Sequence, residues 1–218
     1  MNMVPTIKLH LFFARDNSRA VILRQGPSKR YRMILWDRQT NRFEDGQWLD
    51  HKVYVERCNL SPDGKHFIYF ALDGRWRSEG KGSYSAISRP PYFTALALFP
   101  QGHTWGGGGS FIDNAHYIVA GEGDIIGRAS GLKRIREYDD RLRQSEKAEQ
   151  TTPSDRFEND LYHTEQGRLY LRKAQELTLI RDFTDMAFTP IRAPYDWREA
   201  DHPIPSQSPR QLCDGDRS

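Results

Sequence analysis

The sequence predicts a mainly β protein built from about four small antiparallel sheets. Three observations favour this fold class. Short apolar segments recur along most of the chain, turns rich in Gly, Pro, Asn and Asp separate them, and one turn-and-strand pattern returns about every fifty residues. A β-sandwich and a β-barrel are the main alternatives, because they also consist of short strands joined by turns, and an α+β mixture is a third.

The strands can be placed in order along the chain. The first strand is expected at 6–13, and polar turns separate it from later strands at 20–23, 31–36, 67–71, 84–87, 110–112, 117–119, 168–171 and 177–180. Residues 37–51 are polar and are expected to form a connection. Residues 93–99 fit a strand or a short helix, and 132–150 is the one stretch with apolar residues at helical spacing.

Four segments share one pattern. Each has an acidic residue, a small or amide residue, a basic residue three positions after the acid, and then three apolar residues. The segments begin at Asp16, Asp63, Asp113 and Glu165. Repeats of 40–50 residues with several strands per unit are typical of propellers, in which small twisted sheets stack on one another. The repeat therefore predicts a propeller-like stack.

The clearest copy of the pattern is Asn59-Leu60-Ser61-Pro62-Asp63-Gly64-Lys65-His66-Phe67-Ile68-Tyr69-Phe70-Ala71. Pro62 sets the φ angle of the first turn position, Asp63 can bond its own backbone, and Gly64 can adopt a positive φ. This segment resembles the blade motif of the TolB-like and WD40-like β-propeller families. The resemblance covers residues 59–71 and implies a blade fold without a particular activity.

Composition sets the expected domain and compartment. Aromatic residues are 12% of the chain, which supports a folded core although the hydrophobic content is only 37%. Residues 1–200 are expected to form one β-rich repeat domain, and 201–218 a disordered tail. Two cysteines cannot build a disulfide framework, and the sequence has no segment typical of a signal peptide or membrane span. These features predict a cytoplasmic protein without membrane association.

Charge gives little support to nucleic-acid binding. The chain has 32 basic and 29 acidic residues, whereas proteins that coat nucleic acid usually carry a larger or more concentrated positive charge. The densest basic stretch, 128–143, is interleaved with acidic residues, so a solvated face of mixed charge is the simpler interpretation. A nucleic-acid-binding accessory factor, using this stretch with Arg75, Arg77 and Lys81, is nevertheless one alternative function.

Residues 101–110 have the most unusual local composition, with four consecutive glycines after His103 and Trp105. Consecutive glycines permit close backbone approach to a ligand, and the histidine and tryptophan could supply a base and a stacking surface. No Gly-Lys-Ser/Thr follows the run, and a strand follows where a phosphate loop requires a helix. A loop between sheets is the simpler interpretation.

Two Arg-Pro-Tyr corners form the other candidate site. Arg89-Pro90-Pro91-Tyr92 recurs as Arg192-Ala193-Pro194-Tyr195, about two repeats later, and Trp197 follows the second copy. We expect equivalent structural corners at these positions. A pocket made from two arginines and two tyrosines would suit a small anionic or sugar-like ligand.

The sequence offers no catalytic motif. The histidines have no metal-ligand spacing, no Gly-x-Ser-x-Gly elbow is present, and neither cysteine has a neighbouring histidine, so no catalytic residue, metal or cofactor is predicted. We expect a non-enzymatic binding or scaffold protein that engages a protein partner or self-associates. A hydrolase acting on a sugar or phosphoester at the propeller centre is the main alternative. The candidate binding residues are Arg89, Tyr92, His103, Trp105, Arg192, Tyr195 and Trp197.

Overall fold

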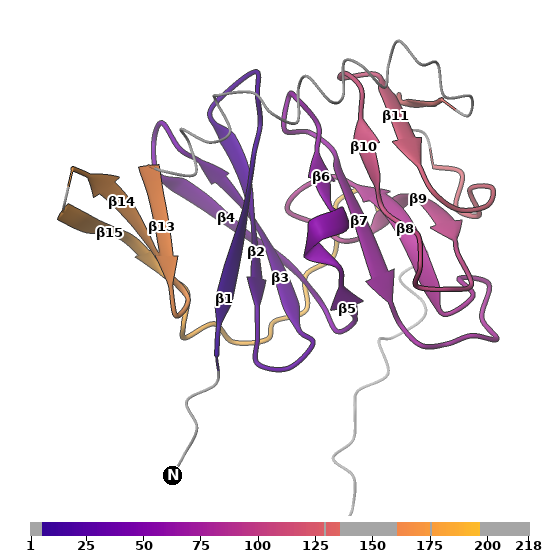
Figure 1. Ribbon diagram of the computed structural model, residues 1–218, viewed down its shortest axis with the longest axis horizontal. Coiled ribbons are helices and arrows are strands. Elements are labelled where there is room, and N and C mark those ends of the chain that lie inside the picture. Colours follow the sequence, from indigo (N-terminus) through magenta and orange to yellow (C-terminus); the bar gives the residue numbers. More distant parts are fainter. Residues whose placement is uncertain (1–5, 129, 136–160, 175, 197–218) are drawn as a thin grey trace, which may run out of the picture.

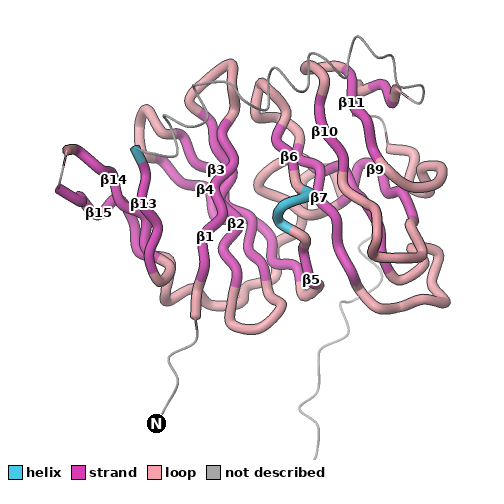
Figure 2. The backbone as a smooth tube through the Cα atoms, viewed as in Figure 1, coloured by secondary structure: helices cyan, strands magenta, loops and turns pink. Residues whose placement is uncertain are grey.

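Four small β-sheets lie side by side in the computed structural model, which describes residues 6–128, 130–135, 161–174 and 176–196 (Figure 1). Strands and loops make up nearly all of this part of the chain (Figure 2). The sheets are mainly antiparallel, and none of them closes into a barrel within the described residues. The predicted fold class, a mainly β protein with four small antiparallel sheets, is confirmed.

Sheets A and B form the centre of the molecule. Sheet A is a meander of β1 (Lys8–Phe13), β2 (Arg19–Gln25), β3 (Tyr31–Asp37) and β4 (Arg42–Leu49). Sheet B contains β5 (Lys52–Val53), β6 (Asn59–Leu60), β7 (Phe67–Leu72), β8 (Ser83–Ser88) and β9 (Ala95–Pro100). The short strands β5 and β6 pair with opposite ends of β7, and the 3-10 turn η1 (Val55–Arg57) lies between them in sequence.

Sheets C and D are the two outer sheets. Sheet C contains β10 (Gly109–Phe111), β11 (His116–Val119) and β12 (Lys133–Arg134), of which β12 runs parallel to β11. Sheet D contains β13 (Tyr162–Glu165), β14 (Arg168–Lys173) and β15 (Glu176–Asp182). In space the order of the sheets is D, A, B, C, so the last sheet of the chain packs beside the first (Figure 1).

Three apolar clusters join the sheets in pairs. Between A and B, Val21, Leu23 and Met33 pack with Phe67 and Tyr69. The remaining two clusters join A to D through Ile22, Ile34, Trp36, Leu169 and Phe183, and B to C through Ile68, Phe99, Phe111, Tyr117 and Val119. Each sheet therefore buries apolar side chains against its neighbour, which is the dominant favourable term in folding.

Sheets A and B are covered on both faces, and their sequences reflect this. Successive side chains of a strand point to opposite faces, so Val21 faces sheet B while Ile22 faces sheet D. A strand that is buried on both faces needs apolar residues at nearly every position. This explains why β2 and β7 read as continuous apolar runs.

The expectation of a connection over residues 37–51 is wrong, because Arg42–Leu49 forms β4, an edge strand of sheet A. The strand was missed because its sequence carries Arg42, Glu44 and Asp45 and mostly half-buried side chains. An edge strand with one face near solvent tolerates such charges, and charges on edges also prevent pairing with other chains.

The structure also decides two expectations in the middle of the chain. The apolar stretch 93–99 forms a strand and not a helix, since β9 covers Ala95–Pro100. The helical spacing noted at 132–150 does not produce a helix at its start, since Lys133–Arg134 pairs as a strand with His116 and Tyr117. Residues 136–150 lie outside the described residues, as does the predicted tail at 201–218. Strand β13 was not predicted.

The turns of the four repeated segments do not all lie at one end of the sheets. The turns beginning at Asp16, Asp63 and Asp113 lie together, as hydrogen bonds described below show. The fourth turn contains Gly167, where an added Cβ would lie 2.8 Å from Cγ2 of Ile7, just before β1 begins. Because the Asp16 turn follows β1, the fourth turn lies at the opposite end (Figure 1).

Candidate functional site

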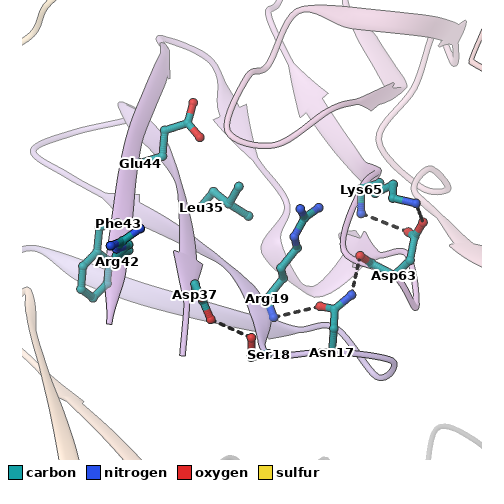
Figure 3. Close-up of a pocket in the computed structure, with 10 residues that line it drawn as sticks. All are labelled: Asn17, Ser18, Arg19, Leu35, Asp37, Arg42, Phe43, Glu44, Asp63 and Lys65. Atoms are coloured by element: carbon teal, nitrogen blue, oxygen red, sulfur yellow. Dashed lines mark hydrogen bonds and ion pairs between the residues drawn. The ribbon is translucent and has the colours of Figure 1, made fainter. Parts of the chain in front are cut away.

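A cleft of about 580 Å³ opens between sheets A and B at the end where the three turns meet. One wall comes from β2, β3 and β4, and the other from the turn between β6 and β7 (Figure 3). The lining residues are Asn17, Ser18, Arg19, Leu35, Asp37, Arg42, Phe43, Glu44, Asp63 and Lys65.

Strand register builds the first wall. Arg19 pairs with Asp37, which pairs with Arg42 on the next strand, and Leu35 pairs with Glu44 two positions further along. Paired residues of antiparallel strands project from the same face of the sheet. These five side chains therefore share one face of sheet A. It is the face that packs on sheet B, because Leu35 also pairs with Val21 of the core between these sheets.

Local turn chemistry builds the second wall. The hydroxyl of Ser61 donates to Oδ1 of Asp63 at 2.7 Å and accepts from the backbone N–H of Lys65 and of His66. Gly64 has a φ of +69°, and an added Cβ there would lie 2.9 Å from Cβ of Arg19. Glycine is thus required both by the turn and by the close approach of the first wall.

Hydrogen bonds tie the three turns to one another. The Asn17 side chain donates to the carbonyl oxygen of Asp63 at 2.9 Å. The side chain of Asn114 accepts from the backbone N–H of Asp63 at 2.8 Å and donates to Oδ2 of Asp16 at 2.7 Å. The turns of sheets A, B and C therefore hold the rim of the cleft in place.

The two aspartates of the cleft are ionised and already engaged. Hydrogen bonds from the hydroxyls of Ser18 and Thr40, each 2.7 Å long, lower the pKa of Asp37 to about 2. Partial burial opposes ionisation of Asp63, but hydrogen bonds from Ser61 and Lys65 outweigh it and lower the pKa of this carboxyl. Neither group suits the role of a general acid at neutral pH.

The arginines of the cleft are free by comparison. The guanidinium groups of Arg19 and Arg42 are exposed and have no hydrogen-bond or ion-pair partner among the described residues. Figure 3 shows Arg19 between the two walls. Glu44 accepts one long hydrogen bond, 3.3 Å, from the hydroxyl of Tyr92. The cleft therefore offers two unpaired positive charges and one weakly engaged carboxylate.

The structure brings the two predicted Arg-Pro-Tyr corners together. The rings of Tyr92 and Tyr195 meet edge to face with centroids 6.0 Å apart, and Cζ of Arg89 lies 5.6 Å from the centre of the Tyr195 ring. The Tyr195 hydroxyl donates to the carbonyl of Thr94 at 2.8 Å, and burial raises its pKa to about 12. Tyr195 thus fastens the end of the described chain to sheet B.

The members of these corners lie at different distances from the cleft. Tyr92 reaches the rim through its hydrogen bond to Glu44. Arg192 is exposed and donates from Nε to the carbonyl of Asp196, which is a local contact. Trp197 lies outside the described residues.

His103 and Trp105 lie away from the cleft. The carbonyl of His103 accepts a 2.6 Å hydrogen bond from Ser83 at the start of β8, whereas the cleft lies at the start of β7. The antiparallel pairing of β7 with β8 places these two starts at opposite ends of sheet B. The side chain of Trp105 is 91% exposed.

The glycine run packs against the protein's own chain. An added Cβ would lie 2.4 Å from the Phe70 ring at Gly107 and 2.4 Å from the carbonyl oxygen of Arg57 at Gly108. The Arg57 guanidinium also donates to the carbonyl of Gly106 at 2.8 Å. Close approach is needed here, but the glycines approach β7 and η1 of the same chain and not a ligand.

Sequence reasoning missed most of the cleft. Arg19 holds the basic position of the first repeated segment, so the pattern contained a signal for that residue. Arg42 and Glu44 become neighbours of Arg19 only through the register of β4, which was not predicted. Their roles could not be found without the pairing of the strands.

Metal ligands do not gather in the described part of the chain, where no group of three or more His, Cys, Asp or Glu residues could hold an ion. Burial raises the pKa of the Cys58 thiol above its ordinary value, so this cysteine is a weak nucleophile. Within the same residues, no helix is long and apolar enough to cross a membrane.

The fold and the site together define a mainly β protein of four small sheets with a charged cleft between the two central ones. Comparison with known proteins finds no matching family model, no matching curated protein and no matching solved structure. The function therefore has to be inferred from the geometry and chemistry of the cleft.

Proposed function

We propose that the protein is a non-enzymatic binding protein that engages an acidic segment of a partner protein in the cleft between sheets A and B. The main observation that supports this proposal is that Arg19 and Arg42 are unpaired among the described residues, while the aspartates beside them are already hydrogen-bonded. Arginine presents a planar fork of donors that matches a carboxylate. Two such forks, on the strands that flank β3, suit acidic side chains spaced along an extended segment.

The shape of the cleft favours a peptide over a small molecule. Sites for small ligands are usually concave and mostly apolar, and they bury most of the ligand. This cleft is open and is lined mainly by charged and polar residues. Leu35 supplies an apolar contact between the charges, and Glu44 can receive a basic side chain. An extended chain can use these groups in succession.

The second wall is rigid, which supports binding without rearrangement. Asp63 is held through its side chain by Ser61 and through its backbone by Asn17 and Asn114. Binding to a preformed surface avoids the entropic cost of ordering it. Most of the conformational entropy lost on association would therefore be that of the partner segment, and little would be that of the cleft.

A propeller-like construction is part of the same proposal. Face-to-face packing of four small sheets and the shared position of three repeated turns support it. The fourth turn at the opposite end means that sheet D would be an irregular unit. We also propose a cytoplasmic location, based on the low cysteine content and the buried thiol of Cys58.

Nucleic acid is a less suitable partner for this surface. The basic residues Arg75, Arg77 and Lys81 lie in the loop between β7 and β8, at the other end of sheet B from the cleft. Lys81 is also paired with Glu122 at 2.5 Å. A continuous positive stripe, which phosphate backbones require, is therefore interrupted.

The test is selection of peptides from a random-sequence library displayed on phage. The wild-type protein should enrich peptides with spaced Asp or Glu residues, and the Arg19→Glu/Arg42→Glu variant should lose this enrichment. Arg77→Glu is the matched control, because it changes an exposed arginine at the far end of sheet B. Selected peptides should bind the double variant at least about tenfold more weakly.

Two results would contradict the proposal. One is enrichment of acidic peptides that is unaffected by the double variant. The other is displacement of a selected peptide by a short DNA or RNA oligonucleotide that itself binds more tightly, since this would identify phosphate as the preferred ligand.

A further inference from the structure

Strand β15 (Glu176–Asp182) forms an edge of sheet D whose only strand partner among the described residues is β14. Two of its leucines are largely exposed, Leu177 at 46% and Leu179 at 51%. An exposed apolar edge strand is a template for pairing with another chain unless charges, proline or a covering segment block it. The leucines lie in the part of β15 without such protection, between Glu176 and Ile180.

The hairpin identifies which backbone groups of this edge are free. Lys173 pairs with Glu176, so only two residues separate β14 from β15. The closing pair of such a hairpin exchanges both of its hydrogen bonds, and bonded and non-bonded pairs then alternate. Leu177 and Leu179, opposite Arg172 and Tyr170, fall in non-bonded pairs. Their N–H and C=O groups therefore point away from β14.

We infer that β15 pairs antiparallel with β15 of a second copy of this chain, about a two-fold axis at Thr178. Such an axis is perpendicular to the sheet, so both copies present the same face on the same side. A residue of β15 can therefore oppose only residues that project from the same face. The free groups of Leu177 and Leu179 must also meet each other. Both conditions are satisfied when Leu177 opposes Leu179 of the second copy and Thr178 opposes its own counterpart.

Side chains and charges are compatible with this register. On one face Leu177 packs against Leu179 of the second copy, which removes two exposed apolar groups from water in each chain. On the other face Thr178 opposes Thr178 and Glu176 opposes Ile180, so no like charges are directly opposed. The hairpin tip of one copy, with Arg172 and Lys173, ends beside the part of the second copy that carries Asp182, which has the opposite charge.

The pairing is short, which sets the expected strength. The register of β14 and β15 shifts between Leu169 and Tyr170, so the regular part of the edge runs only from Glu176 to Leu179. Such a contact falls below the roughly 1,200 Å² of a standard stable interface. We therefore expect a reversible dimer whose population rises with protein concentration. It is independent of the proposed cleft, which lies between sheets A and B.

Disulfide trapping tests the register in the full chain. With Cys213→Ser as background, Thr178→Cys places two thiols at a non-bonded pair with Cα atoms about 4.5 Å apart, which is within disulfide range. Mild oxidation should convert this variant to a disulfide-linked dimer with twice the 25.4 kDa mass of the chain. Glu176→Cys, which opposes Ile180, should stay monomeric. Cross-linking of both variants to the same extent, or of neither, would overturn the inference.

Sedimentation velocity over a range of concentrations tests the contact without cross-linking. Leu177→Lys/Leu179→Lys should abolish dimer formation, because like charges then oppose each other across the axis. Leu177→Lys/Leu179→Glu should restore the dimer, because the introduced charges then have opposite signs. Retention of the dimer in the double-lysine variant, or a wild-type protein that is monomeric at every concentration, would overturn the inference.

Discussion

Arg24 joins the first sheet to the last, because its Nε donates a 2.8 Å hydrogen bond to the carbonyl oxygen of Phe183, 159 residues later in the chain. The same guanidinium donates to the carbonyls of Gly26 and Thr184. It also lies 5.3 Å from the centre of the Trp48 ring. A buried arginine is costly to desolvate unless its donors are satisfied, and here backbone carbonyls satisfy them.

Replacement of Arg24 should therefore loosen sheet D. Arg24→Met retains the apolar stem but leaves the carbonyls of Phe183 and Thr184 without this donor. We expect the free energy of unfolding to fall by about 3 kcal/mol in urea denaturation. Arg30→Met is the control, since its 3.6 Å ion pair with Asp50 is exposed and should contribute under about 1 kcal/mol. Equal effects of the two substitutions would contradict the importance of the buried contact.

Alanine substitution at two glycines with similar backbone angles can distinguish the cost of backbone strain from the cost of a steric clash. Gly64 has a φ of +69° and Gly74 a φ of +73°, but only the first would bring an added Cβ close to another residue, Arg19. Gly74→Ala should cost about 1 kcal/mol of stability, which is the typical cost of alanine at a positive φ. Gly64→Ala should cost at least about 1 kcal/mol more, because sheet A must move. Similar losses of stability would show that the cleft wall is not tightly packed there.

Asp37 should make stability depend on pH in the acid range. Its pKa is about 2 in the folded protein, below the ordinary value of 3.8, because Ser18 and Thr40 donate to the ionised carboxylate. The folded state thus holds this proton less tightly, so the stabilisation is complete above about pH 4 and is lost as pH falls towards 2. Asp37→Asn should flatten the stability profile in this window. An unchanged profile between pH 4 and pH 2 would contradict the assignment.

Substitution of Tyr195 should lower stability more than substitution of Tyr92, although both residues belong to the Arg-Pro-Tyr corners. Tyr195→Phe removes the hydrogen bond to the Thr94 carbonyl from a half-buried site, and we expect a loss of about 1 kcal/mol. Tyr92→Phe removes a longer bond to Glu44 at the cleft rim and should change stability by under about 0.5 kcal/mol. Calorimetry of both variants measures the difference. A larger loss of stability for Tyr92→Phe would reverse the roles given to them.

The sequence predicted the parts of the fold that depend on near neighbours. The strands at 6–13, 20–23 and 31–36 could be placed because alternation and turn residues act over a few positions. The turn at Ser61–Gly64 could be predicted for the same reason, since Asp63 and Gly64 satisfy it locally. Strand β4 could not, because its charged residues are tolerated only at the edge of a sheet.

Tertiary structure determined which strands and side chains are neighbours in space. Nothing near Arg42 in sequence indicates that it lines a cleft with Arg19 and Lys65, because that depends on register across three strands and on packing between two sheets. The contact of Arg24 with Phe183 likewise depends on sheet D returning to sheet A. Local propensity determined the strands and turns of this protein, whereas long-range packing of apolar faces determined the order of its sheets and the position of its candidate site.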